Sequence, residues 1–417
     1  MRITLVNTSD VVGGAERCSY DLARELRAAG HDATLVVGRK LGNDPFVVEL
    51  RAPAGDLALR RFCVEQLGLT ETVLASPVSA CRSRPEFRAE VCNIHNMHGG
   101  YWNIWALPLL ARRAPLVLTL HDEWLLTGDC GYSYECDRWL AGCGRCPQAR
   151  WPDPSERYAV GGRDATRLNL WLKRRCLGTL SASAVTVVAP SRWLLDRARR
   201  TPHLSRFPLV QIEYGVDLDV FRPPEDARRA RVELGLPVDD FLLFTAATDL
   251  AHSRKNFQAL AELAASSVWP RRCALVCAGS LEPAARAELA HLPILLLGRL
   301  SDRRTLARAL GACDATVLAP LADNFPYVAL ESLACGRPVL ASRVGGIPEI
   351  IEDGVTGWLV PSQAAAWDLG QALGRVVRLP AASLESMQRA ARAEAERRFS
   401  LSRFRDAYLR LFSDCAA

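Results

Sequence analysis

The residues best suited to chemistry are two carboxylates in the second half of the chain. Asp323 lies in a polar loop behind an apolar run that ends at Pro320, and Glu331 follows inside a helical segment. A loop that leads into a helix can turn both carboxylates toward one cleft, where a carboxylate can accept both hydroxyls of a ribose. The start of that helix offers free N–H groups to a sugar or a phosphate. The alternative is a helix-capping aspartate beside a solvated glutamate.

Two further segments have residues that suit a phosphate group. Arg254 and Lys255 follow an apolar run and are predicted to open a helix, where a cationic pair suits a diphosphate. The alternative is a basic helix start that faces solvent. Near the N-terminus, Gly13 and Gly14 form a turn that lets a ligand approach the backbone. Two glycines are not a dinucleotide fingerprint, so a plain tight turn remains the alternative there.

Histidines follow two of the predicted strands in the first half. His121 comes directly after the run 116–120, and His95 and His98 come after the run 92–94. Side chains at the carboxyl ends of parallel strands line the ligand crevice of an α/β sheet. A lone histidine is more often structural, so position alone makes these residues candidates and no more.

Four cysteines lie close together after His121. Cys130, Cys136, Cys143 and Cys146 are separated by gaps of five, six and two residues. A Cys-x2-Cys pair with two nearby thiols can build a tetrahedral zinc site, which would hold a polar, glycine-rich loop that has little core of its own. The spacing is not that of a standard zinc finger. The alternative is four reduced thiols, or disulfides that form only on oxidation.

Short apolar runs alternate with helical patterns along the whole chain, which predicts βαβ units and parallel sheets. Asp217–Pro224 breaks the alternation, so we expect two sheets joined by a linker near 205–225. A charged helix ends at Arg397–Arg398, and a last helix follows at Leu401–Phe412. The predicted strands lie near 3–6, 33–37, 92–94, 116–120 and 184–188 in the first half, and near 241–246, 273–278, 294–297, 315–318 and 339–341 in the second.

The composition of the 417 residues is that of an ordinary globular protein, with 49% hydrophobic and 24% charged residues. The net charge of +6 suits anionic small ligands or anionic lipid and is too small to argue for nucleic acid. No run is long and apolar enough to cross a bilayer, and the N-terminus lacks the features of a signal peptide. We therefore expect a cytoplasmic protein. Basic stretches at 157–175 and 192–206 suggest peripheral contact with the inner face of the cytoplasmic membrane, or else solvated helix faces.

The region 314–361 resembles the family 4 glycosyltransferases, in which an acidic residue, seven others and a glutamate mark the donor site. The subgroup with Asp-Asn-Phe-Pro in the loop matches best, although most members have glutamate where Asp323 stands. The segments 189–193 and 213–217 are similar to the family's Pro-Ser turn and its linker, and Gly354–Pro361 is similar to a hairpin near its C-terminus. The stretch 120–148 looks like an insert of the capsule and colanic-acid-type members.

The resemblance implies the GT-B fold, which has two facing Rossmann-like domains with parallel sheets and a C-terminal helix that crosses back. It divides the chain into an acceptor-side domain at 1–205 with a Cys-rich insert at 120–150, a nucleotide-sugar-binding domain at 206–395, and a helix at 396–417 that packs on the first domain. It implies a retaining hexosyltransferase without a catalytic metal. The donor would be a UDP- or GDP-sugar, and the acceptor a saccharide or lipid-linked saccharide of cell-surface polysaccharide biosynthesis.

The resemblance also implies residue roles. Lys255 would neutralise the leaving diphosphate, and His121 would touch the donor sugar. Two departures stand beside Lys255: Asn256 replaces the usual glycine, and Asp249 stands where many members carry an arginine. Arg254 would then supply the second positive charge. The catalytic group would be His121, Lys255, Asp323 and Glu331, and the donor site would include Gly13, Gly14, Arg254, Lys255, Arg299, Asn324, Phe325, Pro326 and Glu331.

Other functions remain as alternatives. A nucleotide-sugar epimerase can share this fold, and comparing sugar transfer with epimer formation separates the two. A zinc-containing nucleic-acid-binding module would interleave aromatic and basic residues among the cysteines, but acidic residues lie there as well. A dinucleotide oxidoreductase is disfavoured because the chain lacks Gly-x-Gly-x-x-Gly.

Overall fold

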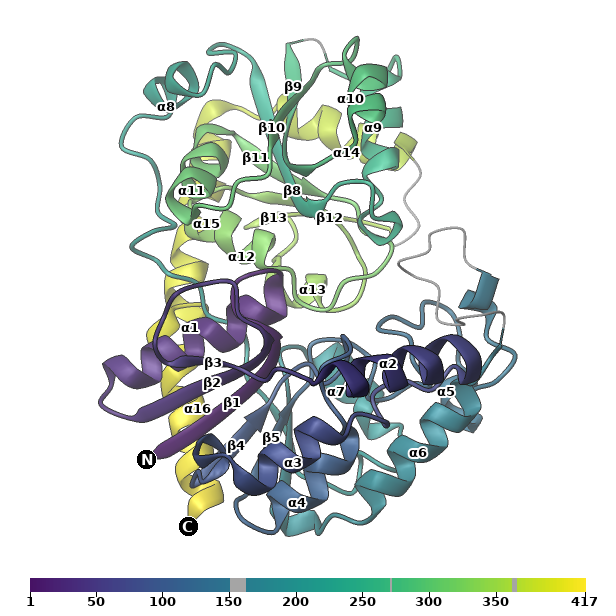
Figure 1. The fold of residues 1–417 in the computed structure, drawn as a ribbon. Coiled ribbons are helices and arrows are strands. Elements are labelled where there is room, and N and C mark those ends of the chain that lie inside the picture. The colour runs from purple at the N-terminus through teal and green to yellow at the C-terminus, as the bar shows by residue number, and fades with distance from the viewer. Residues whose placement is uncertain (151–162, 271, 362–365) are drawn as a thin grey trace. The chain divides into compact units, whose positions relative to one another are not determined.

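The computed structural model describes residues 1–150, 163–270, 272–361 and 366–417 (Figure 1). They form two compact units. The first unit comprises Met1–Glu213 together with Ser402–Ala417, and the second comprises Tyr214–Leu401. The chain therefore returns to the first unit for its last helix.

The described residues of the first unit build a seven-stranded sheet in the order β3-β2-β1-β4-β5-β6-β7, in which every neighbouring pair is parallel. The runs 91–94, 116–119 and 185–189 are buried at every position, as expected for strands covered on both faces. The strands are β1 Arg2–Ser9, β2 Asp32–Arg39, β3 Val47–Glu49, β4 Val91–Ile94, β5 Leu116–Thr119, β6 Val185–Ala189 and β7 Leu209–Gln211.

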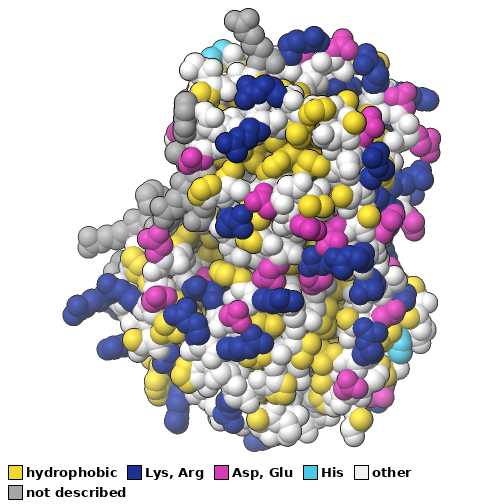
Figure 2. Space-filling view, turned by 180° about the vertical axis from the view of Figure 1, so that it is seen from behind, with side chains coloured by type: hydrophobic (Ala, Val, Ile, Leu, Met, Phe, Trp, Pro, Cys, Tyr) yellow, Lys and Arg dark blue, Asp and Glu magenta, His cyan; other side chains and the backbone are white. Residues whose placement is uncertain are grey.

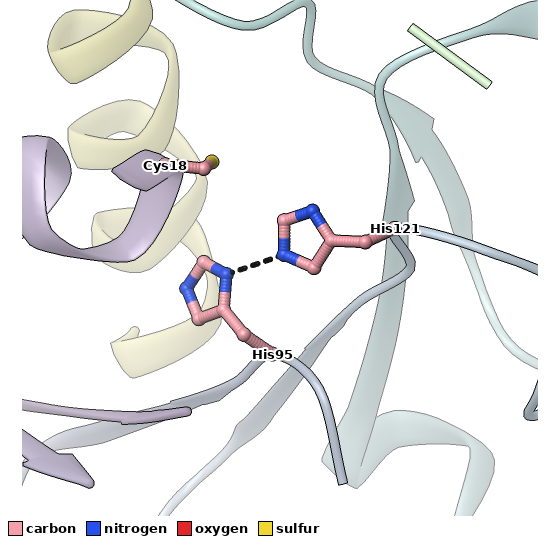
Figure 3. A group of neighbouring side chains, drawn as sticks. All are labelled: Cys18, His95 and His121. Atoms are coloured by element: carbon pink, nitrogen blue, oxygen red, sulfur yellow. Dashed lines mark hydrogen bonds between the residues drawn. The ribbon is translucent and has the colours of Figure 1, made fainter. Parts of the chain in front are cut away.

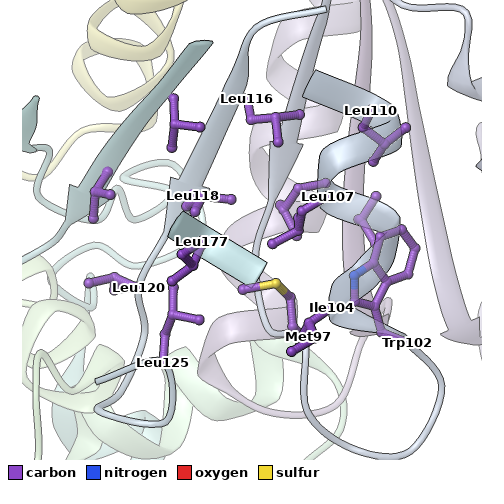
Figure 4. Close-up of a cluster of buried hydrophobic side chains, with 14 of the residues drawn as sticks. Met97, Trp102, Ile104, Leu107, Leu110, Leu116, Leu118, Leu120, Leu125 and Leu177 are labelled. Atoms are coloured by element: carbon purple, nitrogen blue, oxygen red, sulfur yellow. The ribbon is translucent and has the colours of Figure 1, made fainter. Parts of the chain in front are cut away.

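Helices connect these strands and pack on the sheet (Figure 1). They are α1 Gly14–Ala28, α2 Ala54–Phe62, α3 Ala75–Ser83, α4 Leu107–Ala111, α5 Arg138–Ala141, α6 Thr166–Gly178, α7 Arg192–Arg199 and the terminal α16 Leu401–Ala416. A large apolar cluster fills the space between β4, β5, β6 and the helices α3, α4 and α6. Figure 4 shows its centre, where Trp102, Leu107 and Leu110 approach Leu116 and Leu118. This core fixes the strand ends that carry the histidines.

The second unit repeats the architecture with six described strands in the order β10-β9-β8-β11-β12-β13, again all parallel. The strands are β8 Phe241–Asp249, β9 Cys273–Ser280, β10 Ile294–Gly298, β11 Ala315–Leu318, β12 Val339–Ser342 and β13 Gly357–Val360. The helices are α8 Ala227–Glu233, α9 Phe257–Ala265, α10 Pro283–Leu289, α11 Arg303–Ala312, α12 Tyr327–Ala334, α13 Ile347–Ile350, α14 Ala366–Val377 and α15 Ala381–Arg398.

Both sheets are doubly wound around a central pair of strands. The strand order reverses between β1 and β4 in the first sheet and between β8 and β11 in the second. In open α/β sheets, ligands bind beyond the carboxyl ends of the strands at this switch point. The topology therefore marks one place in each unit where binding residues are expected.

The strands predicted from apolar runs are confirmed, and β3, β7 and β13 are additions of three or four residues. Two local predictions are wrong. The segment Gly354–Pro361 is not a hairpin, because β13 pairs in parallel with β12 after a turn closed by Gly354 N–H on the carbonyl of Gly357. Arg254 and Lys255 do not open a helix, because α9 begins only at Phe257. Within the described residues, no helix combines the length and the apolar character needed to cross a bilayer.

Candidate functional site

A cationic pocket lies at the switch point of the second sheet. Its wall includes Thr245 to Ala247 at the end of β8, Leu318 to Pro320 at the end of β11, and the side chains of Lys255 and Asp323. Lys255 Nζ donates to Asp323 Oδ2 at 2.7 Å. Arg254 Nη1 approaches the same carboxylate oxygen at 3.3 Å. One carboxylate therefore holds two cations at the place where the topology predicts a ligand.

Short backbone contacts hold this arrangement in place. Ser253–Lys255 is a 3-10 turn, and the ring of His252 accepts from the N–H of Arg254 at 3.3 Å. Asn256 takes a left-handed φ of 53° and donates its side-chain amide to the carbonyl of Ala319 at 3.0 Å. The carbonyl of Arg254 accepts from Leu321 N–H at 2.9 Å. The turn after β8 is thus tied to the loop after β11, because asparagine tolerates the conformation that the family's usual glycine would take.

The electrostatics of the trio leave a net positive charge. Burial by itself would raise the pKa of Asp323, but the Lys255 ammonium and the Arg254 guanidinium outweigh it and hold that pKa below its usual range. Burial lowers the pKa of Lys255, and Asp323 opposes that shift. Two cations against one carboxylate give a site of charge +1, which suits an anion such as a diphosphate.

Gly345 supports the loop that carries Asp323, and the sequence analysis did not single it out. Gly345 has φ 55°, and a Cβ built there would stand 1.7 Å from the carbonyl oxygen of Asp323. Only a glycine permits this approach, so the loop after β12 fixes the backbone of the acidic loop. The adjacent glycines 345 and 346 were the signal that could have found it.

Of the other predicted donor-site residues in the second unit, one lines this pocket. Pro326 lies on its wall and precedes α12. Asn324 and Glu331 are buried, at 2% and 7% exposure. Phe325 packs edge-on against Tyr214 and Phe399, as a core residue would. Arg299 is exposed beyond the edge strand β10. Of the predicted residues, the structure brings Lys255, Arg254 and Asp323 into direct contact, and the roles of the others stay predictions.

In the first unit, His121 belongs to a buried hydrogen-bonded chain (Figure 3). His121 Nε2 lies 2.8 Å from His95 Nδ1, and His95 Nε2 lies 2.9 Å from Asn93 Oδ1. Asn93 donates its amide to the carbonyl of Val117 at 3.0 Å and to the hydroxyl of Thr119 at 2.9 Å. The hydroxyl of Tyr408 on α16 lies 3.0 Å from Thr119 Oγ1. Sequence reasoning named His121 and gave no partner for it.

This chain of bonds assigns the tautomer of each ring. A backbone carbonyl can only accept, so Asn93 must present Nδ2 to Val117 and Oδ1 to His95. His95 therefore carries its proton on Nε2 and accepts at Nδ1, which makes His121 the donor through Nε2. Burial lowers the pKa of both histidines, that of His121 to about 4, so both rings are neutral near pH 7. His121 is left with an unprotonated Nδ1 as its acceptor atom.

Cys18 of α1 lies beside these rings (Figure 3). Cys18, His95 and His121 are the group of three possible metal ligands in the described parts of the chain whose ligand atoms all lie within 4.8 Å of one another. The ring nitrogens that face each other are already hydrogen-bonded, at a separation shorter than the roughly 3.3 Å that two nitrogens on one tetrahedral zinc require. The geometry favours a hydrogen-bonded pair.

His98 forms an ion pair at the same edge of the first sheet. His98 Nε2 lies 2.8 Å from Asp122 Oδ2, and Trp124 N–H donates to the other oxygen at 2.8 Å. Burial would lower the pKa of His98, but the Asp122 carboxylate more than compensates and raises it. Burial would likewise raise the pKa of Asp122, and His98 holds it below the usual range. Both shifts favour the charged forms of His98 and Asp122, whereas burial favours the neutral forms of His95 and His121.

Gly13 and Gly14 lie at the start of α1, at the switch point of the first sheet. Gly13 has φ 98°, and a Cβ there would stand 2.3 Å from Glu16 Oε2. Burial raises the pKa of Glu16 to about 7, and His98 opposes that shift. The absence of a side chain at Gly13 therefore leaves room for the Glu16 carboxylate, which can titrate near neutral pH.

One residue of the predicted basic surface is buried. Lys173 of α6 donates its ammonium to the carbonyls of Trp124, Thr127 and Gly128, and that ammonium lies 3.4 Å from the ring centroid of Trp124. Its side chain therefore ties the helix to the Cys-rich insert and offers nothing to a membrane, so the prediction fails for Lys173. Arg157 of the same stretch lies outside the described residues.

Comparison with known proteins identifies the family of this chain. A family profile described as Glycosyltransferase Family 4 matches residues 12–220, half of the chain, and one described as Glycosyl transferases group 1 matches 241–378. The chain belongs to glycosyltransferase family 4. The predicted family is thereby confirmed.

Among curated relatives, the D-inositol 3-phosphate glycosyltransferase of Mycobacterium avium is 35% identical over 192 residues, 43% of each protein. The putative colanic acid biosynthesis glycosyl transferase WcaC of Escherichia coli K12 is 24% identical over 270 residues, 63% of this chain and 62% of that protein. The match thus spans about two-fifths to three-fifths of the length of these relatives.

Solved structures share the fold along nearly the whole chain. Sucrose-phosphate synthase from Thermosynechococcus elongatus superposes with a TM-score of 0.72 at 21% identity, covering 99% of this chain and 98% of that one. HepE of Anabaena in complex with UDP-glucose gives 0.67 at 17% identity, covering 99% of each. The GT-B fold is thereby confirmed.

Proposed function

We propose that this glycosyltransferase moves a hexose from a nucleoside diphosphate sugar to an acceptor hydroxyl, with retention, in cell-surface polysaccharide biosynthesis. The observation that carries the donor class is the contact of Lys255 and Arg254 with Asp323 at the switch point of the second sheet. A site of charge +1 suits a diphosphate. A GT-B neighbour of known structure binds UDP-glucose, and another relative is named for colanic acid.

In this proposal, the chain's own residues act mainly on the leaving group. When the bond to the sugar breaks, negative charge grows on the diphosphate, and Lys255 and Arg254 stabilise that charge more strongly in the transition state than in the ground state. Asp323 holds both cations in position beforehand, which lowers the reorganisation needed at the moment of reaction. We assign to Glu331 the contact with the ribose hydroxyls of the nucleotide. A contact of His121 with the donor sugar stays a prediction.

Two alternatives differ in their products. An epimerase would return the nucleotide sugar with one inverted centre and no transfer. A nucleic-acid-binding module would need a positively charged surface, whereas on the face shown in Figure 2 Lys and Arg are interspersed with Asp and Glu.

Contact with an anionic membrane stays a proposal. The residues that favour it are the exposed Leu57, Leu59 and Phe62 of α2 and Leu168 and Trp171 of α6.

The test of the donor site uses Glu331→Gln, which keeps size and removes the charge. Losing a charge-assisted hydrogen bond costs about 1.5–3 kcal/mol, so we expect the dissociation constant of the matching nucleoside diphosphate to rise about 10- to 100-fold by calorimetry. UDP and GDP are titrated separately, and Glu288→Gln on the surface of α10 serves as the control. Unchanged affinity for both nucleotides would remove Glu331 from the donor site.

The reaction class is tested with the wild-type protein. A panel of nucleotide sugars is incubated with saccharide acceptors, and the products are analysed by mass spectrometry and by NMR of the anomeric proton. Transfer with the anomeric configuration of the donor supports the proposal. Inverted products refute retention, and an epimerised nucleotide sugar without transfer supports the epimerase.

A further inference from the structure

The four cysteines of the insert lie around one cavity. Cys130, Cys136, Cys143 and Cys146 all line it, and it encloses about 20 Å³, room for one ion or one water molecule. All four are free thiols. We propose that these four cysteines bind a structural zinc ion as thiolates, with release of four protons on binding.

The backbone between the last two cysteines forms an unusual turn. Gly142, Cys143, Gly144 and Arg145 all have positive φ, at 128°, 59°, 86° and 50°. Left-handed backbone is unfavourable for a non-glycine residue, so Cys143 and Arg145 need a compensating interaction. The turn directs Cys143 and Cys146 to the same cavity, as a chelating Cys-x2-Cys pair requires.

Hydrogen-bond donors are already arranged around the sulfur atoms. The N–H of Gly128 donates to Cys143 Sγ at 3.2 Å. Trp139 lines the cavity, is 1% exposed, and its indole N–H has no hydrogen-bond partner among the described residues. A thiolate is a much better acceptor than a thiol, so metal binding would satisfy these donors.

The charge near the cavity favours the metal-bound state. Zinc with four thiolates carries a charge of −2, and it needs nearby cations when it is buried. The buried ammonium of Lys173 bonds to Gly128 and Thr127, and it interacts electrostatically with Cys130 and Cys143.

The thiols stand somewhat farther apart than in a metal-bound site. Four sulfur atoms on tetrahedral zinc lie about 3.8 Å from one another, given Zn–S bonds of about 2.3 Å. The group of ligand atoms within 4.8 Å in the described chain is Cys18, His95 and His121, so the insert thiols must draw inward on binding.

Zinc at this place would fasten the loop that starts at the catalytic edge of the first sheet. The insert begins directly after His121 and Asp122, and its described helices are the four-residue α5 and the 3-10 turn Pro147–Arg150. Gly144 N–H donates to Thr166 Oγ1 at 3.1 Å, which connects the turn to α6. A metal link between Cys130 and the turn would therefore brace the segment that carries Asp122 and Trp124 against α6.

The experiment measures zinc in the full-length protein, purified without chelators from zinc-supplemented cells, by elemental mass spectrometry and X-ray absorption. We expect about one zinc per chain with four sulfur neighbours at about 2.3 Å. Cys143→Ser and Cys146→Ser should lower the zinc content at least 10-fold. Cys415→Ser, a partly exposed thiol elsewhere in the same unit, is the matched control and should retain it.

The results that overturn the proposal are distinct. Loss of zinc in Cys18→Ser, or nitrogen neighbours in the absorption spectrum, moves the metal to the group Cys18, His95 and His121. Absence of zinc, with four alkylated thiols or two disulfides by intact mass, removes the site altogether. If the serine variants fail to fold, titrating the wild-type protein with a mercurial decides: the proposal requires one zinc released for every four thiols that react first.

Discussion

Replacing Lys255 by alanine tests whether the cationic pocket stabilises the transition state. Lys255 and Arg254 share Asp323 but differ in their other contacts. Arg254 Nη1 also donates to the carbonyl of Ala322 at 3.1 Å, and its own carbonyl accepts from Leu321. The Lys255 ammonium donates to Asp323, and its side chain is 30% exposed. Arg254 therefore shapes the loop, and Lys255 is the more available cation.

The magnitude follows from Coulomb's law. An ammonium about 4 Å from a unit charge interacts with about 4 kcal/mol at an effective dielectric constant of 20. If about half a charge develops on the diphosphate as the bond breaks, the transition state gains about 2 kcal/mol over the ground state, or about 30-fold in rate. A full charge would bring this to about 1000-fold. We expect Lys255→Ala to lower kcat within this range.

The assay compares kcat and KM for the donor at saturating acceptor in Lys255→Ala, Arg254→Ala and Arg286→Ala. Arg286 lies exposed on α10 and controls for loss of one positive charge. Arg254→Ala should raise KM more than it lowers kcat, because the loop loses its anchor. If Lys255→Ala changes KM alone, the residue binds donor and transition state equally and the mechanism is wrong. If neither variant differs from Arg286→Ala, the diphosphate binds elsewhere.

Two further predictions concern the neighbourhood of each site. Gly345→Ala should raise the donor KM at least 10-fold, because its Cβ would collide with the carbonyl of Asp323; Gly354→Ala, also at positive φ (80°) but with nothing within 4 Å, is the matched control and should leave KM unchanged. The pair His98–Asp122 should make stability depend on pH. The raised pKa of His98 gives stability that is present below pH 6.5 and lost as pH rises through the folded-state pKa, and the lowered pKa of Asp122 gives stability lost only in acid. Urea unfolding should therefore show Asp122→Asn destabilised by about 1 kcal/mol near pH 5.5 and by less at pH 9; an equal loss at both pH values would contradict the ion pair.

Much of the fold could be predicted because its signals are local. The strands β4, β5, β6, β8, β9 and β11 are mostly apolar runs, because burial on both faces leaves room for few polar residues in them. The strands β3, β7 and β13 were missed. They have three or four residues and are only partly buried, so they are too short to display a recognisable pattern of apolar and polar residues. Their pairing depends on neighbours that the local sequence does not contain.

The candidate site was predictable in its residue types but not in its contacts. The spacing of Asp323 and Glu331 and the basic pair at 254 and 255 carried the resemblance, yet nothing in it indicated that Asp323 would pair with both cations. Lys173 was misplaced for a related reason. A helical pattern sets only the direction of a side chain, whereas the carbonyls that bind its ammonium lie more than 40 residues away. Long-range polar pairing leaves no local period to detect.

The contacts of Asp323 explain how the site tolerates its departures from the family. Where many members have an arginine, Asp249 accepts from the N–H of Ala251 at 2.9 Å and closes the turn after β8. The second cation comes instead from Arg254, next to Lys255 in one 3-10 turn, and a single carboxylate oxygen serves both. Two cations in adjacent positions repel one another, so the shared carboxylate is what keeps them together before an anion arrives. Asp323, one carbon shorter than glutamate, is thus a counter-ion of the proposed diphosphate site in addition to any contact with the sugar. Because the three side chains are in contact, replacing any one of them must alter the contribution of the other two, and the effects of the substitutions should not be additive.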